Sequence, residues 1–341
     1  MKNNSTLQDI AAAAGVSRAT VSYVLTGKKK VSKETTEKIL EIAAAQGYTT
    51  TKISKVKKEL EKMPFIGFLV LPNWVRSDED YFVFAAQEGI HTKLKESGYC
   101  LVYNRLDRFN TSDDPELMRF VDSVKGLIIL NPWDDEVFAN FMENVRLRNI
   151  PHVLIGSPDD DNTYYVDMDI VSAAYQSSSA LLSKGCKHIV YIDSPKGMKQ
   201  TSQILKGYSL AHEEREIPWV EEHMIHAKVT SIEEGIRIVE SVMATDRKVD
   251  GFITPNDVLA QGVVIALQKM KIRIPEDCKV ISLGGGVISS QISYPRISSV
   301  DYNPYQMGQE AAAMLLDIIS KKRMRPTHSV FAAILIERET T

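Results

Sequence analysis

The spacing of apolar residues along the chain changes near residue 64. Before it, apolar residues recur every three or four positions, as in Val21, Val24 and Leu25, which predicts amphipathic helices. Beyond it, short apolar runs alternate with stretches of helical spacing, which predicts strands and helices in βαβ order. The expected strands are Phe65–Leu71, Tyr99–Tyr103, Gly126–Leu130, His152–Ile155, His188–Ile192, Gly251–Thr254 and Val280–Leu283, and the expected helices include Phe84–Leu94 and Ala174–Leu182.

Three helices are expected between Thr6 and Tyr48. Thr6 and Asp9 have the spacing of a helix cap with its reciprocal acid, and Gly15 permits a sharp turn after the first helix. Ser17 is expected to cap the second helix, which ends at Gly27. Ser32 is expected to cap the third, which ends at Gly47-Tyr48.

The second of these helices has two different faces. Val21, Val24 and Leu25 share an apolar face that should pack on Ile10, Val16 and Ile39, whereas Arg18, Ala19, Ser22 and Tyr23 face the other way. Two helices joined by a tight glycine turn, the second with a short polar face, describe a helix-turn-helix whose second helix enters the major groove of DNA. The alternative is an ordinary three-helix bundle with a solvated Lys28–Lys30 loop.

Charge is distributed unevenly. The net charge is −3, but residues 1–63 carry 12 basic and 6 acidic residues, so the rest of the chain has a net charge of −9. A basic first segment on an acidic remainder directs polyanion binding to the first segment. The chain shows no apolar run of membrane-spanning length and no signal sequence, and its three separated cysteines, Cys100, Cys186 and Cys278, are expected to be reduced structural thiols, so a cytoplasmic location without a membrane partner is expected.

The first segment closely resembles the head of the lactose/galactose repressor (LacI/GalR) family of transcriptional regulators. Residue type and spacing agree over more than forty residues. The matching motifs are Asp9-Ile10-Ala11, Ala14-Gly15-Val16-Ser17, Thr20-Val21-Ser22, Leu25-Thr26-Gly27, Val31-Ser32, Thr35 and Gly47-Tyr48.

The remainder resembles the periplasmic-binding-protein-like body of the same family. Phrases such as Gly126-Leu127-Ile128-Ile129, Ile274-Pro275-Glu276-Asp277 and Ile336-Glu337-Arg338 fall in the expected order. The resemblance implies an all-α head (1–48), a hinge (49–63) and an α/β body (64–341) of two parallel-sheet subdomains. It also implies a homodimer, with subdomain N at about 64–162 plus 292–320 and subdomain C at about 163–291 plus 321–341.

The resemblance also implies which residues meet DNA. Arg18 suits bidentate pairing with guanine, Ala19 either touches a thymine methyl group or leaves room, and Tyr23 occupies another base-reading position. Hydroxyl residues match positions near phosphates, although plain helix capping is the alternative role for them. These residues are Thr6, Ser17, Thr20, Ser22, Ser32 and Thr35.

The hinge departs from the family pattern. Relatives wedge a leucine from a short hinge helix into the minor groove, and the corresponding residue here is Lys57. A lysine suits phosphates but does not unstack bases, so a weaker DNA kink is expected. A charged linker without a helix is the alternative.

The effector cleft that the resemblance implies also differs. Gly156, Ile204 and Gly284 stand where relatives often have two acids and an arginine, and the glycines are interpreted as opened space. The expected effector is therefore bulkier or less polar than a monosaccharide, contacted by Asn256 and by aromatic residues for which core packing is the alternative. The aromatic residues are Tyr81, Phe82 and Trp133.

The expected function is that of a sequence-specific transcriptional regulator, a repressor whose dimer binds a near-palindromic operator and responds to a small molecule. A regulator that works without an effector, or with a protein partner, is the alternative within this class. An enzyme or ligand carrier with an accessory head is the alternative from another class. No grouping of catalytic residues, cofactor motif or metal-ligand spacing supports it, so no catalysis, cofactor or metal is expected.

Overall fold

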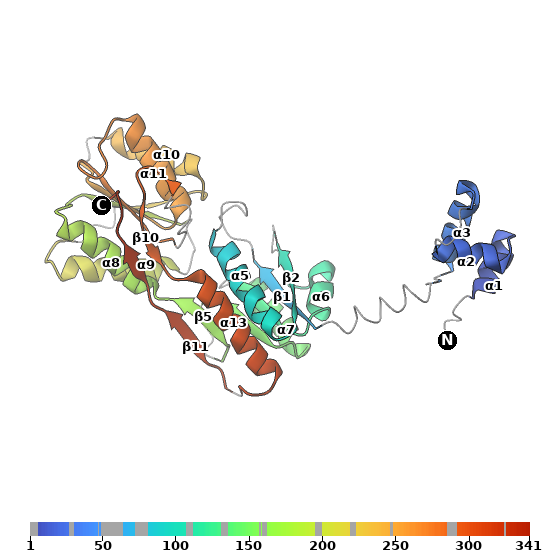
Figure 1. Cartoon of the computed structure of the whole chain (residues 1–341). Helices are drawn as coiled ribbons and strands as arrows, with labels where there is room; N and C mark the ends of the chain where they lie inside the picture. The colour runs from blue at the N-terminus through green and yellow to red at the C-terminus, as the bar shows by residue number, and fades with distance from the viewer. Residues whose placement is uncertain are drawn as a thin grey trace. The chain divides into compact units, whose positions relative to one another are not determined.

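The chain divides into two compact units, Met1–Met63 and Pro64–Thr341, hereafter the head and the body. The structure is a computed structural model (Figure 1). It describes residues 6–26, 31–46, 48, 64–71, 81–106, 112–130, 136–156, 158, 162–194, 200–218, 223–245, 248–284, 292–323 and 325–341. The hinge, residues 49–63, and Trp133 lie outside these ranges.

Three helices build the described part of the head. They are α1 (Leu7–Ala14), α2 (Arg18–Thr26) and α3 (Lys33–Ala45), and each contacts the other two. Ile10, Val21 and Ile39, one from each helix, have no exposed surface and form the centre of a small apolar core. Val16, Val24 and Leu25 pack against this core, so the predicted apolar face of α2 is confirmed.

The body contains two six-stranded sheets. The first has the order β11-β5-β4-β3-β1-β2, and all of its strand pairs are parallel. Central strands such as β1 (Phe65–Val70, FIGFLV) read as continuous apolar runs because helices cover both faces of a parallel sheet. The strands of this sheet are β1, β2 (Cys100–Arg105), β3 (Leu127–Leu130), β4 (His152–Ile155), β5 (Tyr165–Met168) and β11 (His328–Phe331).

The second sheet has the order β12-β10-β9-β8-β6-β7, and only its edge strand β12 runs antiparallel to its neighbour. Its strands are β6 (Ile189–Asp193), β7 (Met224–His226), β8 (Gly251–Thr254), β9 (Lys279–Ser282), β10 (Ser298–Asp301) and β12 (Ile334–Ile336). All seven strands expected from the apolar runs are present in the two sheets, which confirms the βαβ prediction.

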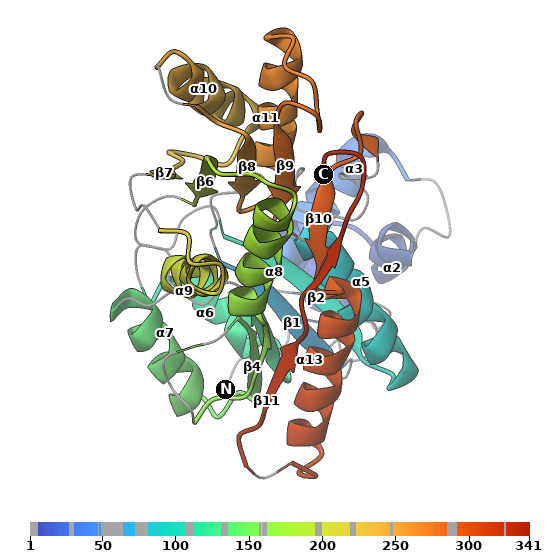
Figure 2. The same cartoon turned by 90° about the vertical axis from the view of Figure 1, so that its left-hand side faces the viewer.

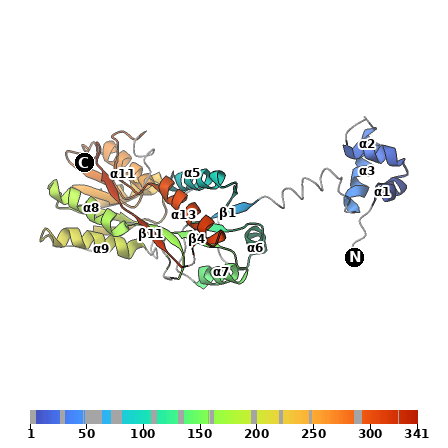
Figure 3. The ribbon, with the colours of Figure 1, turned by 60° about the horizontal axis from the view of Figure 1, so that its bottom comes forward.

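The helices of the body pack in pairs as well as on the sheets. Figure 3 shows α8 beside α9 and α13 beside α5, and α10 similarly contacts α11. The bounds are α5 (Tyr81–Glu96), α6 (Pro115–Asp122), α7 (Glu136–Leu147), α8 (Ile170–Ser183), α9 (Gln200–Glu213), α10 (Ile232–Met243), α11 (Asp257–Lys269) and α13 (Pro304–Ile319).

The chain passes between the two sheets three times. It crosses from β5 into α8, from β10 into α13, and from β11 into β12 (Figure 2). The expected subdomain boundaries need correction at three strands, because β5 and β11 belong to the first sheet and β10 to the second. Strand pairing decides these assignments, and spacing along the chain does not report it.

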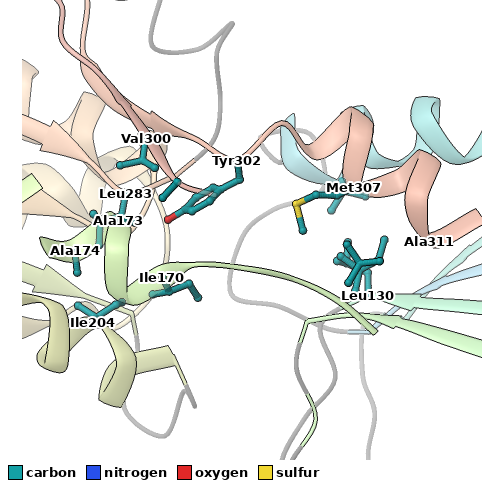
Figure 4. Packing of buried hydrophobic residues seen from close by; sticks show 14 of the residues in the cluster. Leu130, Ile170, Ala173, Ala174, Ile204, Leu283, Val300, Tyr302, Met307 and Ala311 are labelled. Atoms are coloured by element: carbon teal, nitrogen blue, oxygen red, sulfur yellow. The ribbon is translucent and has the colours of Figure 1, made fainter. Parts of the chain in front are cut away.

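A continuous apolar cluster follows these crossings. Tyr302, which follows β10, and Met307 of α13 lie in it with Ile170 of α8 and Leu130 of β3 (Figure 4). Burial raises the pKa of the Tyr302 phenol well above its usual value, and nearby Asp169 and Asp167 raise it further, so the side chain stays neutral. The chain segments at these crossings therefore pack as a core.

Candidate nucleic-acid interface and effector site

The N-terminus of α1 is closed by a reciprocal cap. The backbone N–H and the hydroxyl of Thr6 donate to Oδ2 of Asp9 at 2.7 and 2.8 Å, and the Asp9 N–H donates back to the Thr6 hydroxyl at 3.4 Å. The two bonds from Thr6 hold the pKa of the Asp9 carboxyl below its usual value. Gly15 ends α1 with φ +70°, in the left-handed region that the turn into α2 requires.

The other two helices of the head begin with the same serine–threonine arrangement. The Thr20 N–H donates to the Ser17 hydroxyl at 3.1 Å, and the two hydroxyls lie 2.8 Å apart. The Thr35 N–H donates to the Ser32 hydroxyl at 3.2 Å, and that hydroxyl donates to the Thr35 hydroxyl at 2.7 Å. Three helix N-termini therefore carry hydroxyls, a setting that favours anions.

The remaining predicted DNA residues divide by exposure. Arg18 and Ala19, in the first turn of α2, are exposed, whereas Ser22 and Tyr23 one turn later are half-buried. Ser17 and Ser32 are both exposed, and both lie at the start of a helix. Lys57 lies outside the described residues.

In the body, Asn256 is held in place by the start of a helix. It follows β8 and caps α11, where its Oδ1 accepts the Leu259 N–H at 3.1 Å, and its backbone oxygen accepts the Thr254 hydroxyl at 3.0 Å. Asn256 is therefore the residue that caps α11, whereas Asp257 is the first residue of the helix and is buried. Ligands of parallel α/β sheets bind at the carboxyl ends of strands, where Asn256 lies.

The interpretation of Gly284 as opened space is wrong. A Cβ atom added at Gly284 would lie 2.5 Å from Cα of Asn256, so this glycine allows two backbone segments to approach closely. Gly156 has φ +112°, a conformation that other residues rarely adopt. Ile204 belongs to α9, is only 5% exposed and packs in the apolar core, so an apolar side chain fills that position.

Asp193 is a candidate site residue that the sequence analysis did not find. It is the last residue of β6 and is 1% exposed, and its Oδ2 accepts the Thr201 hydroxyl at 2.6 Å. His226, its partner on β7, places Nδ1 3.5 Å from the same oxygen. Oδ1 is buried and has no hydrogen-bond partner in the described part of the chain. Buried carboxylate oxygens normally have partners, so this atom is suited to accept a bond from a ligand or a water. The signal in the sequence was an acid that ends a strand of apolar residues.

The three predicted aromatic residues are not equivalent. Tyr81 and Phe82 form the first turn of α5 and are half-buried, and Phe82 packs against the apolar core, which was the alternative role for it. Trp133 lies outside the described residues. A ligand contact of Tyr81 stays a prediction.

A recess of about 870 Å³ lies elsewhere in the body. Lys271, Arg273, Tyr294 and Glu339 contribute to its lining, and it adjoins the residues that precede β9 and β10. It is therefore at the amino ends of these strands, opposite the edge where Asp193 and Asn256 lie.

No three described His, Cys, Asp or Glu residues are arranged to hold a metal ion. The described helices include none that is long and apolar enough to cross a bilayer.

Comparisons with known proteins agree with both units. A profile described as "Bacterial regulatory proteins, lacI family" matches residues 6–51, and one described as "Periplasmic binding protein-like domain" matches residues 179–341. The HTH-type transcriptional regulator RegA of Clostridium saccharobutylicum is 26% identical over 99% of both chains.

Two solved structures share the fold over nearly the whole chain. A complex of the transcriptional regulator CelR with cellobiose has a TM-score of 0.72 at 22% identity and covers 99% of this chain and 100% of its own. The lac repressor dimer bound to operator and an anti-inducer has a TM-score of 0.70 at 19% identity and covers 99% of each chain. With a helix-turn-helix head, a two-sheet body and matches to both profiles, the chain belongs to the lacI family of bacterial regulatory proteins.

Proposed function

We propose that this protein is a cytoplasmic repressor that binds operator DNA through its head and changes its DNA affinity when a small molecule binds its body. The observation that carries the DNA-binding role is the exposed first turn of α2, which presents Arg18 and Ala19 beside helix N-termini that carry hydroxyls. The guanidinium would read guanine in the major groove, and the hydroxyls at the three N-termini would position the head on phosphates.

Binding of a near-palindromic operator requires two copies of the head, and we propose a homodimer formed through the body. Strongly exposed apolar side chains of the body include Phe84 of α5 at 59%, Ile292 at 77% and Tyr294 at 86%. Exposed apolar groups of this size are suited to burial against a second copy. A Tyr294→Asp variant should shift the sedimentation equilibrium toward monomer, whereas Val229→Asp, at a side chain that is also exposed, should not.

The effector is proposed to bind at the carboxyl ends of the strands, where Asp193 and Asn256 lie. A carboxylate oxygen without a partner attracts hydroxyl and amine groups and repels anions. We therefore propose a neutral or cationic effector rather than a sugar phosphate. Cellobiose, the ligand named for the solved CelR complex, is larger than a monosaccharide and is the first neutral probe.

A direct test of the DNA-binding role is protection of a DNA segment from nuclease digestion by the full chain. Protection of one near-palindromic segment, weakening as salt is raised, is expected. Binding of all duplexes with equal affinity would contradict the role of a sequence-specific repressor.

The effector is tested by a thermal-shift screen of the full chain. The panel contains cellobiose, glucose, glucosamine and glucose 6-phosphate. A ligand at 100 times its Kd should add about 2.7 kcal/mol to the free energy of unfolding. A micromolar glucose 6-phosphate complex that is unaffected by Asp193→Asn would contradict the proposed effector class. A body that responds to none of these while DNA binding persists would favour the alternative of a regulator that works without a small molecule.

A further inference from the structure

The amino edge of the first sheet is rich in basic residues. All strands of this sheet are parallel, so their first residues lie along one edge, and the helices that run back between them end at the same edge. Loops that lead into the strands lie there as well. The cations of this region include Lys93 and Lys95 at the end of α5, Lys125 before β3, Arg146 and Arg148 at the end of α7, and Lys321, Lys322, Arg323 and Arg325 between α13 and β11.

Acids neutralise only part of this edge. Lys93 pairs with Glu96 at 3.1 Å and Arg148 with Asp122 at 3.1 Å. Arg323 lies 3.5 Å from Asp317. Arg146 donates to the Thr163 hydroxyl at 3.4 Å. The remaining five exposed cations of this group take part in no ion pair within the described ranges. We call these five residues, Lys95, Lys125, Lys321, Lys322 and Arg325, the basic edge.

The positive charge of the basic edge contrasts with the net negative charge of the body. Residues 64–341 carry a net charge of −9, so a positive region here is not a consequence of overall composition. Helix dipoles favour cations near helix C-termini, which accounts for Lys95. Lys125 and Arg325 lie in loops outside the last helical turns, and their charges add to a field that reaches about 8 Å at physiological salt.

The head is attached to the body at this same edge. Residues 49–63 lead to Pro64, which directly precedes β1. The Cys100 N–H donates to the Pro64 oxygen at 3.0 Å and the Lys125 N–H to the Phe65 oxygen at 2.7 Å, so Lys125 lies beside the point of entry. DNA held by the head is thus tethered to the basic side of the body at a high effective concentration.

We propose that the basic edge binds the phosphates of the DNA that flanks the site held by the head. This inference rests on the proposed function. The contacts carry no sequence information, because they involve the backbone alone, and they add affinity and salt dependence to whatever the head recognises. An acidic protein would suit the same charge, but only DNA is brought to this edge by the chain itself.

The test uses the full chain and a nonspecific duplex, because phosphate contacts do not require the operator. One variant changes Lys95, Lys125, Lys321 and Lys322 to Gln, and a second changes the same lysines to Arg. A matched control changes four exposed lysines that lie outside the basic edge, Lys187, Lys206, Lys248 and Lys269, to Gln. The dissociation constant is measured between 50 and 200 mM salt, and unchanged thermal midpoints establish that each variant is folded.

The Gln variant is expected to bind more weakly at 50 mM salt and to converge with the unchanged chain at high salt. The slope of log K against log salt should become shallower by about 0.9 for each phosphate that the variant no longer neutralises, and by about 2 or more in total. The Arg variant and the matched control should keep the original slope. Equal slopes for the Gln variant and the matched control would overturn the inference and leave the proposed function intact. The inference would also be overturned if the Gln variant bound an acidic protein more weakly than the unchanged chain does but bound DNA equally well. Failure of the unchanged chain to bind any duplex would overturn both the inference and the proposed function.

Discussion

Gly235 and Gly262 face each other where α10 packs on α11. A Cβ atom added at Gly262 would lie 2.8 Å from Cα of Gly235 and 2.3 Å from the backbone oxygen of Ile232. Side chains at these positions would keep the helices apart, so two glycines allow their backbones to touch. This contact fixes the helix pair that covers one face of the second sheet, beside the start of α11 at Asn256.

Gly262→Ala should destabilise the body. The added methyl group meets backbone rather than a flexible side chain, so α10 must move, and overpacking of this kind costs about 1–3 kcal/mol. The free energy of unfolding is measured by calorimetry on the full chain. Ser241→Ala, on the exposed side of α10, is the control and should change little. A Gly262→Ala protein as stable as the control would show that the helices separate without cost.

Thr201→Val should destabilise the protein more than Asp193→Asn. The valine removes the hydroxyl that donates to Asp193 and leaves a buried carboxylate with less support, a loss of about 1–3 kcal/mol. The asparagine removes a buried charge and keeps an acceptor for Thr201, so it should be neutral or stabilising. Thermal midpoints of both variants without ligand are the measurement. Equal losses would indicate that Asp193 contributes to folding rather than to ligand recognition.

Arg18→Ala should weaken operator binding by about 1–3 kcal/mol and relax the base preference at one position in each half-site. The side chain is exposed in the first turn of α2, where a major-groove contact is expected. Binding to a library of operator variants measures both effects. An equal loss of affinity for a scrambled duplex would assign Arg18 to a phosphate instead.

Two cysteines should resist alkylation across the neutral range. Burial raises the pKa of the Cys186 thiol to about 11 and that of the Cys278 thiol to about 12. Both thiols therefore stay protonated at neutral pH, where the reactive thiolate is scarce. Mass spectrometry after iodoacetamide treatment of the native chain should find modification at half-buried Cys100 first. Rapid labelling of Cys278 at mildly alkaline pH would indicate that this part of the second sheet opens readily.

Continuous apolar runs made seven strands predictable, and most of the missed strands lack them. β10 has the sequence SSVD, yet Ser298 and Ser299 are buried. The C-terminal residues satisfy these serines, because the Ser298 N–H donates to the Thr340 hydroxyl at 2.8 Å and Arg338 donates to the Ser299 hydroxyl at 2.8 Å. Partners about forty residues away make a polar strand stable, and local spacing cannot report them. The other missed strands include β5, β7 and β11, which are also short and partly polar.

The site was predictable in the head and less so in the body. Caps such as Thr6 and Ser17 act over three or four residues, and the sequence reports such short distances directly. In the body, Gly284 was misinterpreted because its role depends on the backbone of Asn256, which follows a different strand. Asp193 was missed because its burial and its partner Thr201 become apparent only when α9 is placed on the sheet.

The three crossings between the sheets have a mechanical consequence. Two subdomains joined by one chain segment can rotate in many directions. Two subdomains joined by three adjacent segments are restricted to a few motions in which all three segments bend together. A ligand that draws the carboxyl edges of the two sheets together must therefore move one half of the body relative to the other as a rigid unit. Because α13 leaves one crossing and ends at the basic edge, any such movement is transmitted along a rigid helix to the side of the body from which the head departs.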